Sequence, residues 1–319
     1  IFMATNEKGY VDPLLTGFVV DYAANLDRGF IGRKLFPIVS VEKDDAQYPF
    51  FSKENFVTPD DNINDFEGEA RRADLSSELK HIHCIPHALR EGIDVRKNRQ
   101  MDGPFKVKER AASRRLSYKL LTREELRIAD LVKAHANGQT LAGTGSAATN
   151  QWANGGGDPF AVADAAKSNM WFEPNTLVLS YDVYLALKKH TKVLEKLGAN
   201  EAKIVTAQIL AELFEVNQVL IGSGRWAGPR KKNDKSVAMT RIWSNLAAFA
   251  YVDPEDQAVT CGKIFLERHE SVDADGFLVR TWHDATKGVE GTDVVQVGLV
   301  SSEAIVAADC LYVVKSVLA

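Results

Sequence analysis

Residues 104–136 read PFKVKERAASRRLSYKLLTREELRIADLVKAHA and predict a single long helix. Gly103–Pro104 opens the stretch with proline at the first helical position, and Asn137–Gly138 ends it. At about 1.5 Å per residue, such a helix is roughly 45 Å long. Its apolar stripe is narrow, which indicates a spine lying across a thin structure, since a helix inside a globule carries a wider apolar face. The stripe consists of Ala112, Leu116, Leu120, Ile128, Leu131 and Val132.

The segment before this helix, residues 38–95, predicts strands without an obvious core of their own. IVSVEK and AQYPFF lead in, HIHCIPHALREGIDV leads out, and the acidic, irregular stretch TPDDNINDFEGEARRADL lies between them. This order is typical of a long two-stranded excursion with a solvated tip. Residues 1–37 predict an extended arm with one short helix near Leu14–Ala24.

The segment after the helix predicts a compact α/β unit. Asp158–Pro159 caps one helix and Thr206 caps another, and Gln218–Ile221 is a strand. Between them, a strand ends at Leu179 and Ser180 occupies the N-cap position of the next helix. A strand–turn–helix of this kind is where ligands bind in open α/β sheets. Here the turn carries no glycine-rich loop, no nucleophile and no base.

The final third predicts mostly strands. KIFLERHE and GFLVRTW flank a predicted hairpin turn at Asp273–Gly276, and RIWS with LAAFAYV predicts a strand pair around Asn245. VVQVGLV, EAIVAA and LYVVKSV predict closing strands.

Composition excludes several classes of protein. A formal net charge of −4 over 319 residues lacks the basic excess of a protein that grips nucleic-acid phosphates. The three cysteines, Cys84, Cys261 and Cys310, are too few and too far apart for a disulfide framework and favour a reducing compartment. No apolar run reaches the length that a membrane span needs.

Candidate chemical sites all have plainer explanations. His81, His83, Cys84 and His87 resemble a metal cluster, but a strand separates them onto two faces. The glycines at 143–145 and 155–157 lack phosphate-loop spacing, and Asp158 would repel a phosphate from the helix that follows. No catalytic triad or dyad is present. The sequence therefore predicts no catalytic residue, no metal site and no cofactor.

Four stretches together carry a family resemblance. They are DPFAVADAAKSNMWFEPNTLVLSYDVYLALKKH from Asp158, VTAQILAELFEVNQVLIGSGRW from Val205, IWSNLAAFAYV from Ile242, and VVQVGLVSSEAIVAADCLYVVKSVLA from Val294. Residues 158–319 resemble the major capsid protein of tailed bacteriophages, the Hong Kong 97 type of fold. Residues 1–137 match that family in the order and proportion of their elements.

The resemblance implies an α+β shell subunit. It implies an N-terminal arm (1–37), an extended loop (38–95), a spine helix with a peripheral domain (96–157), an axial domain (158–255) and returning strands of both domains (256–319). Such subunits form hexamers and pentamers of an icosahedral head, which encloses DNA without sequence-specific binding. The implied partners are the chain itself, a portal and a possible decoration protein, with no membrane. The implied location is the virion, after assembly in the host cytoplasm.

Two other interpretations remain open. The same fold serves an encapsulin-like bacterial compartment that holds an enzyme cargo. A different class is a cytoplasmic α/β enzyme with an undetected site near Tyr181.

Subunit contacts are expected at the extended loop and the long helix. Their apolar residues Phe50, Phe51, Phe56 and Leu116 are expected to be covered by neighbouring subunits. The acidic loop tip is expected to form intersubunit ion pairs with a basic side of the helix. The acidic residues are Asp60, Asp61 and Asp65, and the basic residues are Arg110, Arg114 and Arg115.

Overall fold

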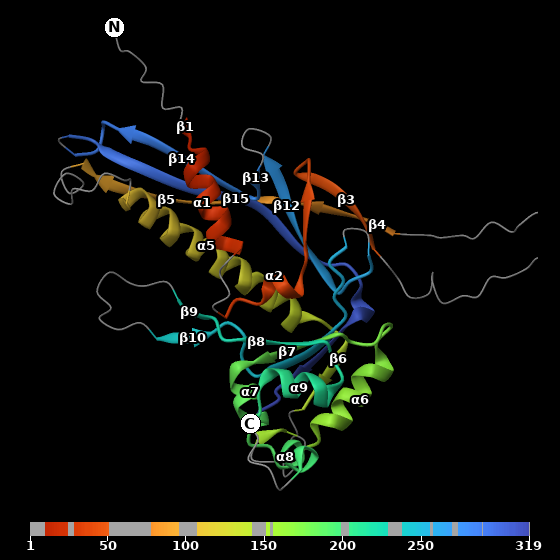
Figure 1. Ribbon diagram of the computed structural model, residues 1–319. Helices are drawn as coiled ribbons and strands as arrows, with labels where there is room; N and C mark the ends of the chain where they lie inside the picture. Colours follow the sequence, from red (N-terminus) through yellow and green to blue (C-terminus); the bar gives the residue numbers. More distant parts are fainter. Residues whose placement is uncertain are drawn as a thin grey trace, which may run out of the picture.

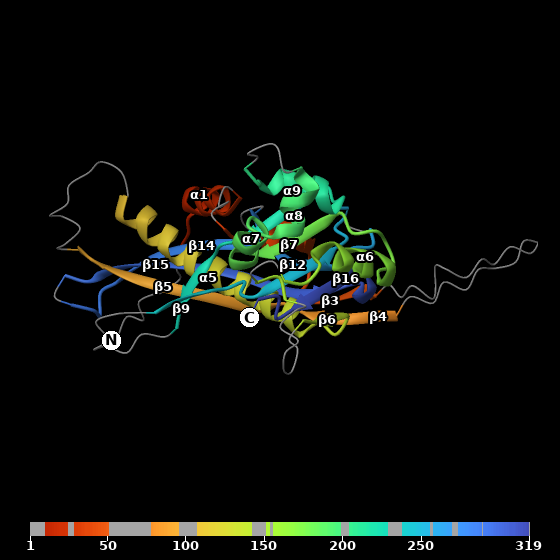
Figure 2. The ribbon, with the colours of Figure 1, turned by 90° about the horizontal axis from the view of Figure 1, so that it is seen from below.

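The protein consists of two β-sheet lobes joined by one long helix (Figure 1). One lobe is built on a seven-stranded sheet and the other on a five-stranded sheet. Turning the molecule by 90° shows the long helix and the seven-stranded sheet as a flat layer, with the helices of the five-stranded lobe on one side (Figure 2). The computed structural model describes residues 10–24, 29–50, 78–95, 107–141, 151–153, 156–198, 204–228, 238–255, 258–269, 274–288 and 290–318.

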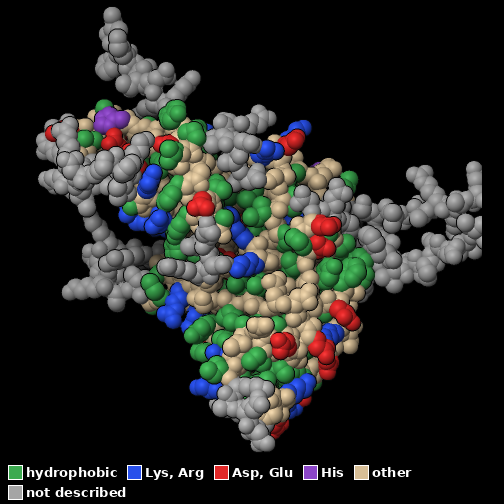
Figure 3. All heavy atoms as spheres, in the orientation of Figure 1, with side chains coloured by type: hydrophobic (Ala, Val, Ile, Leu, Met, Phe, Trp, Pro, Cys, Tyr) green, Lys and Arg blue, Asp and Glu red, His purple; other side chains and the backbone are tan. Residues whose placement is uncertain are grey.

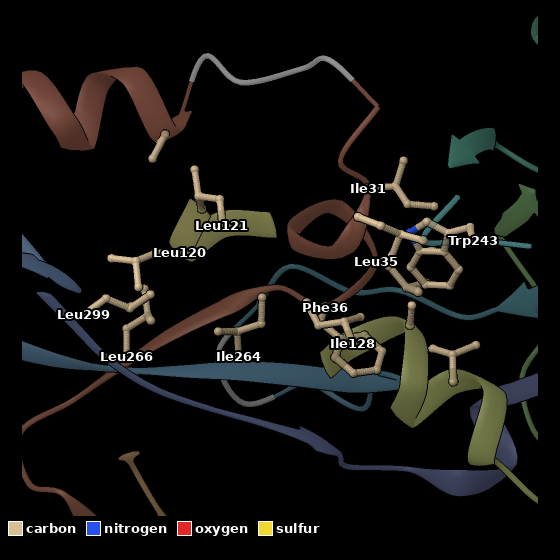
Figure 4. Packing of buried hydrophobic residues seen from close by; sticks show 14 of the residues in the cluster. Ile31, Leu35, Phe36, Leu120, Leu121, Ile128, Trp243, Ile264, Leu266 and Leu299 are labelled. Atoms are coloured by element: carbon tan, nitrogen blue, oxygen red, sulfur yellow. The ribbon is translucent and has the colours of Figure 1, made fainter. Parts of the chain in front are cut away.

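The long helix, α5, spans Val107–Ala134. The predicted apolar stripe faces the core: five of its members are buried, and Leu131 is partly buried against them. Leu116 is 4% exposed within the chain, so the expectation that a neighbouring subunit covers it is wrong. Leu121 and Ala129 widen the buried face beyond the predicted stripe. Figure 4 shows Leu120, Leu121 and Ile128 packing into the cluster that joins α5 to the sheet.

Gly138 explains where the helix segment stops. Its φ of +148° is a conformation that side chains rarely adopt, and a Cβ there would lie 1.9 Å from the Val313 carbonyl oxygen. Only glycine lets the chain pass this close to β16 (Leu311–Lys315), with which β6 (Gly138–Thr140) pairs in parallel.

The seven-stranded sheet is organised around β15 (Thr292–Ile305). β5 (Ile85–Asp94) runs antiparallel along one edge of β15. β12 (Gly262–His269) and β14 (Phe277–Asp284) lie one after the other along the opposite edge of β15. Ser301 of β15 shows this, because it pairs with Ile85 of β5 on one side and with Leu266 of β12 on the other. Three short strands complete the sheet: β1 (Tyr10–Val11) on β14, and β2 (Ile38–Val41) and β13 (Ala274–Asp275) on β12.

This arrangement corrects two strand predictions. KIFLERHE and GFLVRTW do not form a hairpin with each other, since β12 and β14 both pair with β15 and only β13 folds back on β12. VVQVGLV and the start of EAIVAA are one continuous strand, β15. Local turn signals could not reveal that a distant strand provides the common partner.

The base of the predicted excursion is confirmed. β3 (Asp45–Phe50) and β4 (Glu78–His83) pair antiparallel, from Asp45 opposite His83 to Phe50 opposite Glu78. The base of this hairpin is buried against the main sheet. Tyr48, Ile82 and Cys84 pack on Phe265 and Val306 of the main sheet. Residues 51–77, including Phe51 and Phe56, lie outside the described residues.

The predicted N-terminal helix is also confirmed, as α1 (Pro13–Ala24). Asp12 caps it by accepting hydrogen bonds from the backbone N–H groups of Leu14 and Leu15. A short helix, α2 (Gly32–Leu35), follows. The described part of the predicted arm is not extended, because side chains of both helices and of Phe36 are buried in the main core (Figure 4).

The five-stranded sheet forms the second lobe. Its order is β6, β16, β11, β7, β8, with β11 at Leu246–Ala250, β7 at Thr176–Ser180 and β8 at Gln218–Gly222. Successive residues of β7, β11 and β16 alternate between two cores, one against α5 and one against the lobe's own helices. This burial on both faces explains the nearly continuous apolar strands. The helices are α6 (Pro159–Asn169), α7 (Tyr181–Leu187), α8 (Thr191–Leu197) and α9 (Ala207–Phe214).

Two of the three predicted helix caps have their predicted side-chain hydrogen bonds. Asp158 accepts from the N–H groups of Phe160 and Ala161, and Thr206 accepts from Ile209. Ser180 occupies the N-cap position, but its hydroxyl instead accepts from the N–H of Leu246 on the neighbouring strand, at 3.4 Å.

The strand pair predicted around Asn245 is wrong. β10 (Met239–Arg241) pairs with β9 (Arg225–Ala227) as a separate ribbon, whereas β11 pairs with β7 and β16. The intervening Trp243 is fully buried between the two lobes (Figure 4). A 3-10 turn at Ala308–Cys310 links β15 to β16.

Candidate assembly surfaces

The exposed side of α5 carries the three arginines expected to contact a neighbouring subunit. Arg115 already has a partner in its own chain, because its guanidinium donates to both carboxylate oxygens of Glu91 on β5, at 2.6 and 3.3 Å. The guanidinium of Arg114 lies 5.3 Å from the ring centroids of Phe18 and Tyr22, and that of Arg110 lies 6.0 Å from the Phe18 ring. Helix α1 therefore shapes this basic surface.

The proposed acidic partners of these arginines, Asp60, Asp61 and Asp65, lie outside the described residues. The ion pairs between the loop tip and α5 therefore stay a prediction. The contact between Arg115 and Glu91 is exposed, so it is worth at most about 1 kcal/mol. A partner that offers several carboxylates can compete with it.

The buried side of α5 carries two adjacent glutamates. Glu124 is buried and forms a two-point ion pair with Arg33 of α2, with N–O distances of 2.6 and 3.0 Å. Glu125 is 3% exposed and accepts from the N–H groups of Ile31 and Gly32 and from the Trp243 indole. Burial raises the pKa of Glu125, and these three donors act against that rise.

Glu125 therefore connects three parts of the fold. It lies on the long helix, its backbone donors are at the start of α2, and Trp243 directly precedes the five-stranded sheet. Sequence reasoning did not identify either glutamate. A signal was present: the i, i+4 series of apolar residues that passes through Leu116 and Leu120 continues at Ile128, so position 124 lies in the middle of the buried face.

A partly buried ion pair fixes α5 to β15. Arg127 donates to both carboxylate oxygens of Glu303, at 2.6 and 2.8 Å, and also to the Ser301 hydroxyl. This geometry is more specific than that of a surface pair.

The histidine and cysteine candidates do not come together. His81 and His83 are exposed on β4, and the His81 ring lies 3.3 Å from the Gln47 amide nitrogen. Cys84 is buried, and that burial raises the pKa of its thiol to about 11. Burial lowers the pKa of His87. Over the described part of the chain, no three His, Cys, Asp or Glu side chains are arranged to hold a metal ion.

The turn at Tyr181 packs against the β9–β10 ribbon. The Arg241 guanidinium lies 4.2 Å from the Tyr181 ring centroid and 3.1 Å from an oxygen of Asp182.

Cys261 and Cys310 are also buried, which raises the pKa of each thiol to about 12. Among the described residues, no helix is both long and apolar enough to cross a membrane.

Comparison with known proteins identifies the family. No family model matches the sequence. The major capsid protein of Burkholderia phage BcepMu is 30% identical over 251 residues, which cover 76% of each chain. The chain belongs to the major capsid proteins of tailed bacteriophages. As a phage major capsid protein it is a structural component of the virion, and it is not an enzyme.

Solved structures share the fold of this capsid protein. A phage-related protein from Bordetella bronchiseptica has a TM-score of 0.73 at 18% identity and covers 97% of the chain. The capsid of cyanophage P-SCSP1u has a TM-score of 0.55 at 9% identity, with 88% of this chain and 86% of that one covered.

The encapsulin of Synechococcus elongatus has a TM-score of 0.54 at 14% identity, with 89% of this chain and 86% of that one covered. The mixed α+β architecture is therefore common to phage capsids and encapsulins. The sequence relative, not the fold, assigns this chain to the phages. The enzyme interpretation with a site near Tyr181 is wrong.

Proposed function

We propose that this capsid protein assembles into the hexamers and pentamers of an icosahedral head that encloses packaged DNA. The observation that carries the proposal is the β3–β4 hairpin, which leaves the body at one end of the seven-stranded sheet (Figure 1). A small cluster around Tyr48 and Ile82 fixes its base. A hairpin attached in this way can reach a neighbour without disturbing its own subunit.

The domain roles follow from the two lobes. The seven-stranded lobe with α5 acts as the peripheral domain, the five-stranded lobe acts as the axial domain around the capsomer axis, and residues 38–95 act as the extended loop. The tip residues Asp60, Asp61 and Asp65 pair with Arg110, Arg114 and Arg115 of an adjoining subunit. A portal and a decoration protein complete the head, and the DNA inside is held without sequence-specific contacts.

Electron microscopy of the purified protein, by itself and from infected cells, tests the proposal. Closed shells with pentamers at the vertices, filled with DNA in the virion, are the expected result. A population of small dispersed oligomers under all conditions would contradict it. Small shells that contain a protein cargo would instead support the encapsulin-like interpretation.

A further inference from the structure

The five-stranded lobe has two sides of opposite charge. In Figure 1, α7 lies on one side of α9 and α6 on the other, and Figure 2 shows the same separation from below. Figure 3 shows blue basic side chains over the α7 side and mostly red acidic side chains over the α6 side. We name these surfaces the α7 flank (Leu185, Lys188, Lys189 and Arg225) and the α6 flank (Asp164, Phe172, Glu173 and Glu255).

The α7 flank is basic because its acidic residue is already neutralised. Asp182 is paired with Arg241, which also covers the Tyr181 ring. Lys188 lies over the Tyr184 ring, with its nitrogen 4.5 Å from the centroid. Lys189 and Arg225 have no ion-pair partner within the described ranges. The same flank exposes Leu185 of α7, which is 40% exposed.

The α6 flank is acidic for the corresponding reason. Of the lysines on this side, Lys167 is paired with Glu215 and Lys192 with Asp158, and Lys196 lies over the Phe160 ring of α6. Asp164, Glu173 and Glu255 are exposed and have no ion-pair partner in the part of the chain that the structure describes. The same flank carries a stack of aromatic rings in which Phe172 is 37% exposed.

The Phe172 stack is preorganised for a contact. The centroids of Trp171 and Phe172 are 4.7 Å apart and those of Phe172 and Tyr251 are 5.0 Å apart, so three rings hold one another in place. A rigid aromatic residue inside a charged border is the usual composition of an interface centre and its rim.

We propose that the α7 flank of one subunit docks against the α6 flank of the next, as a head-to-tail contact between axial domains. This inference rests on the proposed capsomer function and names the side chains that form one of its contacts. Three cations face three anions, and each flank contributes one exposed apolar side chain to the centre. A contact between two different surfaces of identical subunits closes into a ring when its rotation permits.

Charge reversal on each flank tests the contact. One variant combines Lys188→Glu, Lys189→Glu and Arg225→Glu, and the other combines Asp164→Lys, Glu173→Lys and Glu255→Lys. Each variant should raise the protein concentration needed for assembly about tenfold or more. An exposed ion pair contributes about 0.2–1 kcal/mol. The loss of three pairs is therefore comparable to the 1.4 kcal/mol that corresponds to a tenfold change in affinity. Reversal of both flanks in one chain should restore assembly.

Mixing the two variants shows whether the contact lies between chains. The α7 variant is acidic on both flanks, and the α6 variant is basic on both. In an equal mixture the two kinds of subunit should therefore alternate around a ring. Only a ring with an even number of subunits permits this, so the mixture should recover hexamers. Control variants, Arg280→Glu and Asp130→Lys, change the same kinds of charge at exposed positions of the other lobe outside the extended loop, and should assemble like the parent.

Three outcomes would overturn the inference. The first is normal assembly of either flank variant, and the second is no recovery in the mixture although both variants show parental circular dichroism. The third is normal assembly of the α7 variant with reduced DNA content in the head, which would assign that flank to a polyanion. Failure of the parent protein to form any ring or shell would instead contradict the proposed capsomer function.

Discussion

The indole nitrogen of Trp243 donates a 2.6 Å hydrogen bond to a carboxylate oxygen of Glu125, across 118 residues of chain. Both residues are buried, and the same carboxylate also accepts two backbone N–H groups at the start of α2. One side chain on the long helix therefore holds the N-terminal segment and the five-stranded lobe in fixed positions. These hydrogen bonds form only when the three distant segments have come together.

Replacement of Glu125 by glutamine should destabilise the subunit. A glutamine keeps only one acceptor oxygen, and its amide donors then meet N–H groups that also donate. The free energy of unfolding should fall by about 2–3 kcal/mol, the usual contribution of hydrogen bonds to a charged group. Chemical denaturation of the unassembled subunit measures this change. Asp130→Asn, on the exposed side of the same helix, should change stability by less than about 0.5 kcal/mol.

A second residue pair separates this mechanism from general loss of packing. If the bond between Glu125 and Trp243 matters, Glu125→Gln and Trp243→Phe together should cost less than the sum of the two single changes. Strictly additive effects would mean that the two side chains stabilise the fold independently.

Gly138 should not tolerate a side chain. Its left-handed backbone and the close Val313 carbonyl predict that Gly138→Ala lowers the free energy of unfolding by about 2–3 kcal/mol. Gly228→Ala, where no atom lies within 4 Å of the added Cβ, should be nearly neutral. Gly17→Ala lies in α1, again with free space, and should stabilise the subunit by about 0.5–1 kcal/mol. Equal melting temperatures for all three variants would contradict this interpretation.

The acidic loop tip should matter most for assembly at low salt. Neutralising Asp60, Asp61 and Asp65 to Asn should slow assembly at low ionic strength and have less effect at high salt, because salt screens such charges over roughly 8–10 Å. Light scattering over a salt series measures this. Arg114→Glu with Arg115→Glu should have a similar effect, and combining both sets of changes should restore part of the rate.

The contact between Glu91 and Arg115 provides the control for that experiment. Glu91→Gln removes the partner of Arg115 within the chain but leaves the arginine available to a neighbour. If Glu91→Gln slows assembly as much as the arginine reversals do, the arginine acts within its own subunit. Parental assembly of the acidic variant at every ionic strength would show that the tip is only solvated.

Asp284 gives a prediction about acid stability. Hydrogen bonds from Lys287 and Thr286 lower the pKa of Asp284 to about 2. A carboxyl group with a lowered pKa in the folded state stabilises the fold above its unfolded pKa, and this contribution is lost as the pH falls towards the folded value. Asp284→Asn should therefore be less stable than the parent at pH 5 to 7, and the difference should shrink between about pH 4 and pH 2. A constant difference in thermal unfolding over that range would be inconsistent with this account.

Local features of the fold were predictable from the sequence, and distant partners were not. The end of α5 at Ala134, shortly before the predicted stop at Asn137–Gly138, and the caps at Asp158 and Thr206 depend on neighbouring residues, which the sequence displays directly. The pairing of β12 and β14 with β15 depends on contacts made over long separations, so turn signals at Gly276 led to the wrong hairpin. The predicted contact residues of α5 were correctly placed on its exposed side, but Glu91 as the partner of Arg115 was not foreseen.

The strands at the centre of each sheet have a consequence for the timing of synthesis. β15 is the central strand of one lobe and β16 lies between β6 and β11 in the other, and both come from residues 292–315. While the ribosome still holds these residues, β5 and β14 have no common partner and β11 lacks one of its two neighbours. A nascent chain therefore cannot present a finished subunit to completed copies nearby. Translation itself thereby delays association until both lobes can close.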